Sequence, residues 1–348
     1  MTLADRVNTF GIDLVRRYGQ RVHKLAIHAG FTCPNRDGSK GRGGCSFCNN
    51  VSFNPGAAKA AASTAAPALA NTRPTGQVSA EPSLSGPSVA EQLEAGRRVL
   101  RKRTGAERYF AYFQAYTNTY DDIERLSVLY RQAFDEPDVI GLSVGTRPDC
   151  VPDAVLDLLA GYRAEGHEIW LELGLQSAFD STLARVNRGH SFADYRHTVR
   201  AARLRGIPVC THLIIGLPGE GREAALGTLE RVLALGTDGL KLHPLHVVKH
   251  TLLANQWRRG QYQPLAMDDY IEIAADLIER TPEQVLYHRV TGTAQREILL
   301  APEWCSKKWI VLNGIENALR QRGTVQGSLA ARPDHPSRPD CAVIERVA

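Results

Sequence analysis

Three of the seven cysteines crowd into one loop, where they could bind a metal ion or a metal cluster together. Cys33 precedes the Cys-x-x-Cys pair formed by Cys45 and Cys48. Three thiolates are one ligand short of a closed tetrahedral site, so one metal position stays open for a substrate or a cofactor. The loop also contains glycines that let its backbone fold closely around an inorganic core: Gly38, Gly41, Gly43 and Gly44.

Two kinds of metal site fit this spacing. One is a [4Fe–4S] cluster with an open iron position, and the other is a zinc site with His23, His28 or a distant histidine as fourth ligand. A zinc knuckle is usually a self-contained loop, whereas this loop directly follows a predicted strand. The position of the loop in the chain therefore favours the cluster.

The segments that must position the loop alternate between strand and helix patterns. Strands are predicted at Lys24–Ala29, Arg108–Gln114, Val139–Val144, Glu168–Gly174, Pro208–Ile215 and Gly239–His246. Helices are predicted between them at Val89–Arg103, Asp121–Phe134, Pro152–Glu165, Phe192–Leu204 and Glu223–Leu235. Strict alternation implies an α/β fold with parallel strands and right-handed crossovers. We expect a partial (βα)6 TIM-type barrel, although a doubly wound sheet fits the pattern equally, with the chemistry at the C-terminal ends of the strands.

Domain boundaries follow from changes in composition. Residues 18–262 are predicted to form the partial barrel, after a lead-in at 1–17. Inside the barrel, residues 55–87 are mostly Ala, Pro, Ser, Thr and Gly and are expected to be disordered, because they cannot bury enough apolar surface. Residues 263–325 are predicted to be a mainly helical extension, with helices at Met267–Glu279 and Lys308–Arg322, and residues 326–348 a flexible tail.

The composition of the 348 residues is that of a globular protein, with 43% hydrophobic and 23% charged residues. No apolar run approaches the roughly 20 residues that span a bilayer, and the N-terminal residues lack the apolar core of a signal peptide. We therefore expect a cytoplasmic protein without a membrane partner. Thiols stay reduced in that compartment, so the cysteines are not interpreted as disulfides. The net charge of +5 is compatible with a polyanionic partner but carries little weight alone.

The cysteine loop resembles that of radical S-adenosylmethionine (SAM) enzymes, in the branch related to the Elongator catalytic subunit. It is most similar to the YhcC-like bacterial family, which has a CPNRDG…GRGGC-x-FC core, and it matches that core from Cys33 to Cys48. The resemblance extends from about Tyr18 to Gln326, apart from the Ala/Pro/Ser-rich insert. It includes the segments that follow the predicted strands, at residues 114–120, 143–150, 172–177, 187–190 and 212–220.

This resemblance implies one [4Fe–4S] cluster on Cys33, Cys45 and Cys48, and SAM bound through its amine and carboxylate to the open iron. Electron transfer from the cluster would break the S–C5′ bond and give a 5′-deoxyadenosyl radical, which abstracts a substrate hydrogen. The expected cofactor-binding residues are Gln114, Asn118, Glu172, Gln176, Gly216, Pro218 and Gly219. Glu172 could instead form a structural ion pair, and Gln114 or Asn118 could cap the following helix.

Other residues near the strand ends are candidates for substrate contact. Arg147 and Asp149 bind substrate or form an ion pair at the rim, and Lys241 reaches a carboxylate or is solvated. Cys150 is expected to be a packed cysteine without a chemical role. A second metal site at His243, His246 and His250 is disfavoured, because strand alternation points the first two histidines to opposite faces.

The resemblance to the Elongator branch implies tRNA as the substrate, in particular wobble uridine, and an electron donor of the flavodoxin or ferredoxin type. Basic and aromatic residues suit phosphate contact and base stacking: Arg97, Arg98, Arg101, Lys102 and Arg103, and then Trp304, Lys307, Lys308 and Trp309. They could equally be a solvated helix face and core tryptophans. Two alternatives remain open: a radical enzyme for a small metabolite or a protein side chain, and a non-enzymatic zinc-binding module.

Overall fold

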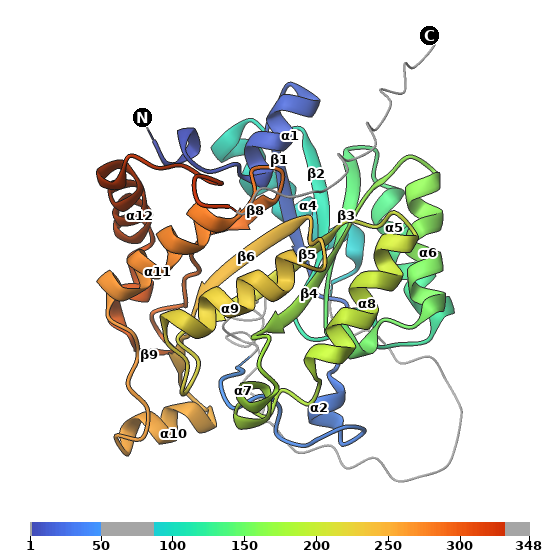
Figure 1. Cartoon of the computed structure of the whole chain (residues 1–348). Coiled ribbons are helices and arrows are strands. Elements are labelled where there is room, and N and C mark those ends of the chain that lie inside the picture. The colour runs from blue at the N-terminus through green and yellow to red at the C-terminus, as the bar shows by residue number, and fades with distance from the viewer. Residues whose placement is uncertain (1, 50–86, 331–348) are drawn as a thin grey trace.

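The computed structural model describes residues 2–49 and 87–330, and its centre is one curved sheet of seven parallel strands (Figure 1). The strands follow one another across the sheet in chain order: β1 (Val22–Ile27), β2 (Arg108–Phe113), β3 (Val139–Thr146), β4 (Glu168–Gln176), β5 (Val209–Ile215), β6 (Gly239–Pro244) and β8 (Leu286–Arg289). The predicted partial barrel of parallel strands is confirmed.

Helices cover the outer face of the sheet, as a parallel sheet requires. They are α4 (Val89–Thr104), α5 (Ile123–Phe134), α6 (Asp153–Ala164), α8 (Phe192–Leu204) and α9 (Arg222–Leu233). Local sequence fixes where they start. At the start of α4 the Ser88 hydroxyl accepts from Glu91 N at 3.2 Å, and the Glu91 carboxylate accepts from Ser88 N at 2.7 Å. This capping box satisfies two backbone N–H groups that would otherwise lack partners.

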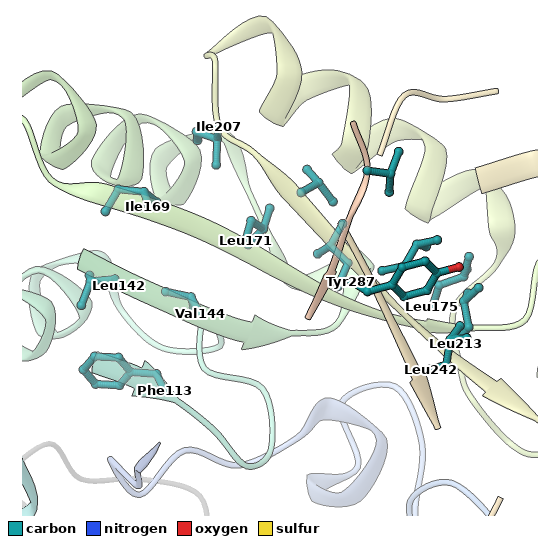
Figure 2. Packing of buried hydrophobic residues seen from close by; sticks show 14 of the residues in the cluster. Phe113, Leu142, Val144, Ile169, Leu171, Leu175, Ile207, Leu213, Leu242 and Tyr287 are labelled. Atoms are coloured by element: carbon teal, nitrogen blue, oxygen red, sulfur yellow. The ribbon is translucent and has the colours of Figure 1, made fainter. Parts of the chain in front are cut away.

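The two faces of each strand have different roles. On β4, Ile169 and Leu171 point outward and pack under the helices with Leu142 and Val144 of β3 (Figure 2). The alternate residue Trp170 points into the barrel. There it packs with residues that plug the end of the barrel where the strands begin: Phe10, Leu14, Val22, Phe110, Cys210 and Leu286. The opposite end of the barrel is therefore the end left for a site.

The seventh strand was not predicted. β8 pairs with β6 inside the region that was expected to be helical, with Leu286 beside Gly239 and Tyr287 beside Leu240. Four residues are too few to show a period-two pattern, so no local pattern marked this strand. The predicted helices of the extension are present as α11 (Met267–Arg280) and α12 (Lys308–Arg322), which pack against each other beside β8 (Figure 1).

Several short elements complete the structure. Helix α1 (Phe10–Tyr18) precedes β1, and α2 (Pro34–Asp37) lies in the cysteine loop. Helix α7 (Asp180–Arg185) follows β4, and α10 (Leu252–Arg258) follows a small antiparallel pair formed by β7 (Val247–Val248) and β9 (Leu299–Ala301). Three 3-10 turns lie at Leu3–Asp5, Pro148–Cys150 and Glu303–Ser306.

The chain ends that were predicted as lead-in and tail are joined near the barrel base. Arg6 donates to Thr324 O at 2.9 Å, and Asn8 N donates to the side chain of Gln326 at 2.9 Å. Gln326, the first residue of the predicted tail, is only 6% exposed. The tail beyond residue 330, which includes Cys341, and the predicted disordered insert up to residue 86 lie outside the described residues. Within the described chain, no helix is both long and apolar enough to cross a membrane.

We predict that Gln326→Ala lowers the free energy of unfolding by about 2–3 kcal/mol, because it leaves buried backbone N–H and C=O groups without their hydrogen-bond partner. Besides accepting from Asn8 N, the Gln326 amide donates to Pro282 O at 2.9 Å and Val285 O at 2.8 Å. Urea denaturation followed by circular dichroism measures the change. Gln321→Ala on the exposed face of α12 is the control and should have no effect. Equal stability of the two variants would show that this junction does not contribute.

Candidate functional site

One cavity opens at the C-terminal ends of the strands, opposite the plugged base. Its wall is formed by the cysteine loop and by residues that end or follow β2 to β6 and β8. Of the predicted site residues, the wall contains Cys33, Cys45, Cys48, Gln114, Asn118, Arg147, Gln176 and Lys241. The predicted residues that do not line it are Asp149, Glu172, Gly216, Pro218 and Gly219.

Local turns set the three cysteines into the wall. Cys33 precedes α2, and its carbonyl accepts from Arg36 N at 2.8 Å. Cys48 N donates to Cys45 O at 3.0 Å, which closes a turn between these two residues. Gly44 has φ of 77°, and a Cβ there would lie 2.8 Å from the Arg36 side chain. Glycine is therefore required where the loop turns back towards Cys45.

Ser46, which lies between Cys45 and Cys48, connects the cysteine loop to the rest of the barrel through backbone hydrogen bonds. Ser46 N donates to Val186 O at 2.9 Å, just after α7, and Ser46 O accepts from Leu253 N of α10 at 2.8 Å. Two short helices that sequence analysis did not predict thus hold the segment between Cys45 and Cys48 in place.

The sulfur of Cys45 faces cationic and polar donors. Arg188 Nη1 lies 3.5 Å from Cys45 Sγ, and the Asn35 amide nitrogen lies 3.8 Å from it. Arg188 is 8% exposed and is fixed by a second bond, from Nη2 to Gly174 O at 2.6 Å. Such donors stabilise a negatively charged sulfur and tune a cluster bound to it.

Cys45 lies close enough to Cys48 to oppose the ionisation of the Cys48 thiol. Burial, followed by the charge of neighbouring Cys45, raises the pKa of Cys48 to about 11. Two adjacent buried thiolates need a positive core to balance them, and metal ligation deprotonates thiols for this reason. The donor set of three cysteine sulfurs with Arg188 beside them therefore fits an iron–sulfur cluster with one open position.

Polar atoms without partners lie on the wall after β2. Asn118 is 1% exposed and uses its amide nitrogen to bond Ala115 O at 3.0 Å and Gly145 O at 2.7 Å. Within the described residues its Oδ1 has no partner, and neither has the Thr117 hydroxyl. Buried polar atoms are normally paired, so these two await a ligand. Asn118 caps no helix; Asp122 occupies the cap position of α5.

Gln176 ends β4 with φ of 79°, a left-handed conformation that is costly for a residue with a side chain. It interrupts the regular register between β4 and β5 and places its side chain on the cavity wall. Strain of this kind is found at sites where a side chain must be directed at a ligand.

Glu172 lies beneath the cavity with 0% exposure and forms ion pairs rather than lining the wall. It accepts from Lys24, from Lys241 Nζ at 2.7 Å and from His212 Nε2 at 2.7 Å. Burial alone would raise the pKa of Glu172, but the two lysines hold it well below its ordinary value. These contacts correspond to the structural ion pair considered above.

Arg147 and Asp149 form an internal ion pair. Arg147 is 2% exposed, and its guanidinium contacts the two Asp149 oxygens at 2.9 and 3.0 Å. Its Nη1 also donates to Arg188 O at 2.7 Å, so the pair supports the residue that faces Cys45. Cys150 beside it is buried, and burial raises the pKa of its thiol to about 12, as suits a packed cysteine.

Pro218 and Gly219 pack against α7 and Gly216 O accepts from the Tyr262 hydroxyl at 2.8 Å, and none of the three lines the cavity. Arg185 of α7 donates to Pro218 O at 2.6 Å, and Gly219 has φ of 80°. A Cβ on Gly219 would lie 1.9 Å from Arg185 Nη1, so the glycine permits this close contact. The turn supports the region of α7, which in turn holds the cysteine loop.

His243 and His246 both line the cavity, with ring centroids 5.9 Å apart, so the prediction that they face opposite ways is wrong. Strand β6 ends at Pro244, and alternation no longer applies beyond it. His250 is not part of the wall. In the described chain, the side chains close enough to share a metal ion are Glu172, Cys210 and His212, but the two lysines on Glu172 oppose a cation there.

Sequence reasoning missed four residues of the site: Asn35, which contacts the Cys45 sulfur behind the wall, and the charged cavity residues Arg36, Arg188 and Arg289. The first three lie within motifs that the sequence analysis used, so their positions were available although their roles were not. Arg289 ends the unpredicted strand β8, and no sequence signal marked it.

Comparisons with known proteins agree with this geometry. Residues 33–232 match the radical SAM superfamily, and residues 237–321 match the radical SAM C-terminal domain. Protein YhcC of Escherichia coli is 48% identical over 96% of this chain and 98% of its own length. Elongator complex protein 3 of Schizosaccharomyces pombe is 28% identical over 57% of this chain, which spans 36% of that protein.

A solved structure shares the fold. The archaeal Methanocaldococcus infernus Elp3 matches with a TM-score of 0.57 at 19% identity, over 68% of this chain and 59% of that chain. The superfamily match covers the cysteine loop and strands β2 to β5, and the match to the C-terminal domain covers β6 and β8. The chain therefore belongs to the radical SAM superfamily and is a radical SAM enzyme that uses a [4Fe–4S] cluster and S-adenosylmethionine.

Proposed function

We propose that this enzyme modifies a nucleoside of tRNA, with wobble uridine as the target, in the cavity beside Cys33, Cys45 and Cys48. The observation that carries the proposal is the charge of the cavity. Within the described chain its wall contains no Asp or Glu, but it contains the cations Arg36, Arg188 and Arg289, in addition to Arg147 and Lys241, which pair with Asp149 and Glu172 behind the wall. A site of this kind attracts an anionic substrate.

The three cysteines are the proposed cluster ligands. When bound, the cluster supplies the electron that cleaves the sulfonium of SAM. Arg188 and Asn35 stabilise the charge on the Cys45 sulfur. The unpaired oxygens of Asn118 and Thr117 are placed to accept hydrogen bonds from the cofactor amine.

Other cavity residues complete the proposed cofactor site. Gln114 and Gln176 supply further polar groups on the wall. Glu172 acts as a positioning residue, because it holds Lys241 through their 2.7 Å contact. Gly216, Pro218 and Gly219 act at one remove, through the packing of their turn against α7.

An aromatic and basic pair at the start of α12, Lys308 and Trp309, supports the tRNA proposal. Trp309 is 73% exposed, and Lys308 Nζ lies 5.7 Å from its ring centroid. Burial, followed by the charge of Arg289, lowers the pKa of Lys308. An exposed tryptophan beside a lysine can stack on a base and contact a phosphate.

The other residues expected to bind tRNA have different surroundings. Trp304 is packed, with its Nε1 donating to Leu265 O at 3.0 Å. Arg97 is bound by Glu94, Glu136 and Asp138. The basic end of α4 lies just before β2 begins, at the end of the barrel opposite the cavity. Of the basic and aromatic residues expected to bind tRNA, the pair of Lys308 and Trp309 is therefore the one that supports the proposal.

The similarity to Elongator complex protein 3 also supports tRNA, although it covers only 57% of the chain. A small anionic metabolite is the second candidate, favoured by the same cationic wall. We propose a flavodoxin- or ferredoxin-type protein of the cytoplasm as the electron donor, because cleavage of SAM requires one electron at a time.

We predict that Cys33→Ser, Cys45→Ser and Cys48→Ser each lose the cluster and the formation of 5′-deoxyadenosine, because each removes one thiolate of three. Anaerobic reconstitution, iron and sulfide analysis, and chromatography after addition of dithionite and SAM measure both losses. Cys341→Ser, outside the loop, is the control and should retain both. Full iron content in any loop variant would refute its role as ligand.

We predict that Trp309→Ala weakens tRNA binding by about 1–3 kcal/mol, the range for one stacked base. Filter binding measures the affinity, and 5′-deoxyadenosine formation without tRNA shows that the cavity is intact. Ile310→Ala removes a neighbouring apolar side chain that is 51% exposed and should change nothing. If tRNA neither binds nor stimulates turnover of the wild type, the small-metabolite candidate replaces tRNA.

A further inference from the structure

We propose that the substrate carries an oxyanion, a carboxylate or a phosphate, that binds between Arg289 and Lys241 on the barrel wall. This inference rests on the proposed function, because it assumes that the substrate meets the cofactor in this cavity. The two cations come from adjacent strands: Arg289 ends β8 and is the register partner of Lys241 on β6. Both line the cavity.

A hydrogen bond to His243 orients the guanidinium of Arg289, and no carboxylate of the described residues forms an ion pair with it. Its Nη1 donates to His243 Nε2 at 2.6 Å. Burial, followed by Arg289, holds the pKa of His243 well below its ordinary value, so this imidazole is a neutral acceptor. No carboxylate pairs with Arg289 anywhere in residues 2–49 or 87–330. Its remaining N–H groups form a fork that matches a carboxylate or a phosphate.

The surrounding charge is positive. Lys24 and Lys241 share the single carboxylate of Glu172, and Arg289 adds a third cation. The histidines supply no balance, because burial lowers the pKa of His212 to about 4 and that of His288 to about 3. Burial, followed by repulsion from Arg289, lowers the pKa of Lys241 to about 8. An oxyanion bound beside Lys241 and Arg289 would relieve this repulsion.

A second, independent observation points to a ligand at the same wall. His246 is 7% exposed and lines the cavity, and in the described chain its Nε2 has no hydrogen-bond partner. Its ring already bonds the backbone of Gly292, so Nε2 is available as an acceptor. A buried polar atom of this kind is normally paired. A hydroxyl or N–H next to the oxyanion of the ligand would satisfy it.

Inorganic phosphate is the probe for this subsite, and phosphorus NMR line broadening with the reconstituted, oxidised holoprotein measures its binding. We expect saturable binding that weakens roughly tenfold or more in Arg289→Gln, as the loss of charge-assisted hydrogen bonds predicts, and less in Arg289→Lys. Arg98→Gln on α4 makes the same change of charge at a side chain that is 70% exposed, and it should have no effect.

Competition between acetate and phosphate distinguishes a carboxylate ligand from a phosphate ligand. Displacement of phosphate by acetate assigns a carboxylate, and retention of phosphate assigns a phosphate; both results support the subsite. Equal phosphate affinity in Arg289→Gln and the wild type would overturn the proposal. Release of phosphate by one equivalent of SAM would also overturn it, since the site would then belong to the cofactor. No tRNA is used, so failure of the tRNA proposal leaves this result unaffected.

Discussion

The buried carboxylate of Glu172 joins the two edges of an open sheet. It lies on the middle strand β4, and it contacts Lys24 of the first strand and His288 of the last, whose Nδ1 is 3.6 Å away. It also binds His212 of β5 and Lys241 of β6. A half-open barrel has no hydrogen-bonded ladder between its outer strands. One carboxylate therefore draws together strands that backbone pairing cannot.

Because the ion pairs share one carboxylate, the stability of the barrel interior depends on every charged member of the network. Removing one member of a buried ion-pair network leaves the other charges uncompensated, which typically costs about 3–5 kcal/mol. Glu172 balances two lysines while two neighbouring histidines stay neutral through burial. The network also separates the cavity from the apolar plug around Phe10 and Trp170. Structural support and the electrostatics of the site thus depend on the same residue.

The sequence predicted the parts of the fold that carry strong local patterns. The six strands from β1 to β6 and the long helices between them were placed within a few residues, because buried parallel strands and amphipathic helices show regular periods. The cysteine loop was recognisable from three residues of one type. Strand β8 could not be predicted in this way. It has four residues, including a histidine and an arginine, and its strand conformation is evident only from its pairing with β6. Contacts between distant segments, such as Arg188 with Cys45, have no local signature at all.

The position of β8 has a consequence for the order in which the molecule can be assembled. During synthesis the cysteine loop and Glu172 emerge well before Arg289, His288 and the Gln326 junction with the N-terminal segment. Until the last strand is added, the barrel lacks one edge and its interior charges lack one of their partners. The binding loop is thus made before the strand that completes the enclosure around it. A cluster inserted before β8 is in place would lie in a cavity that still lacks the wall formed by Arg289.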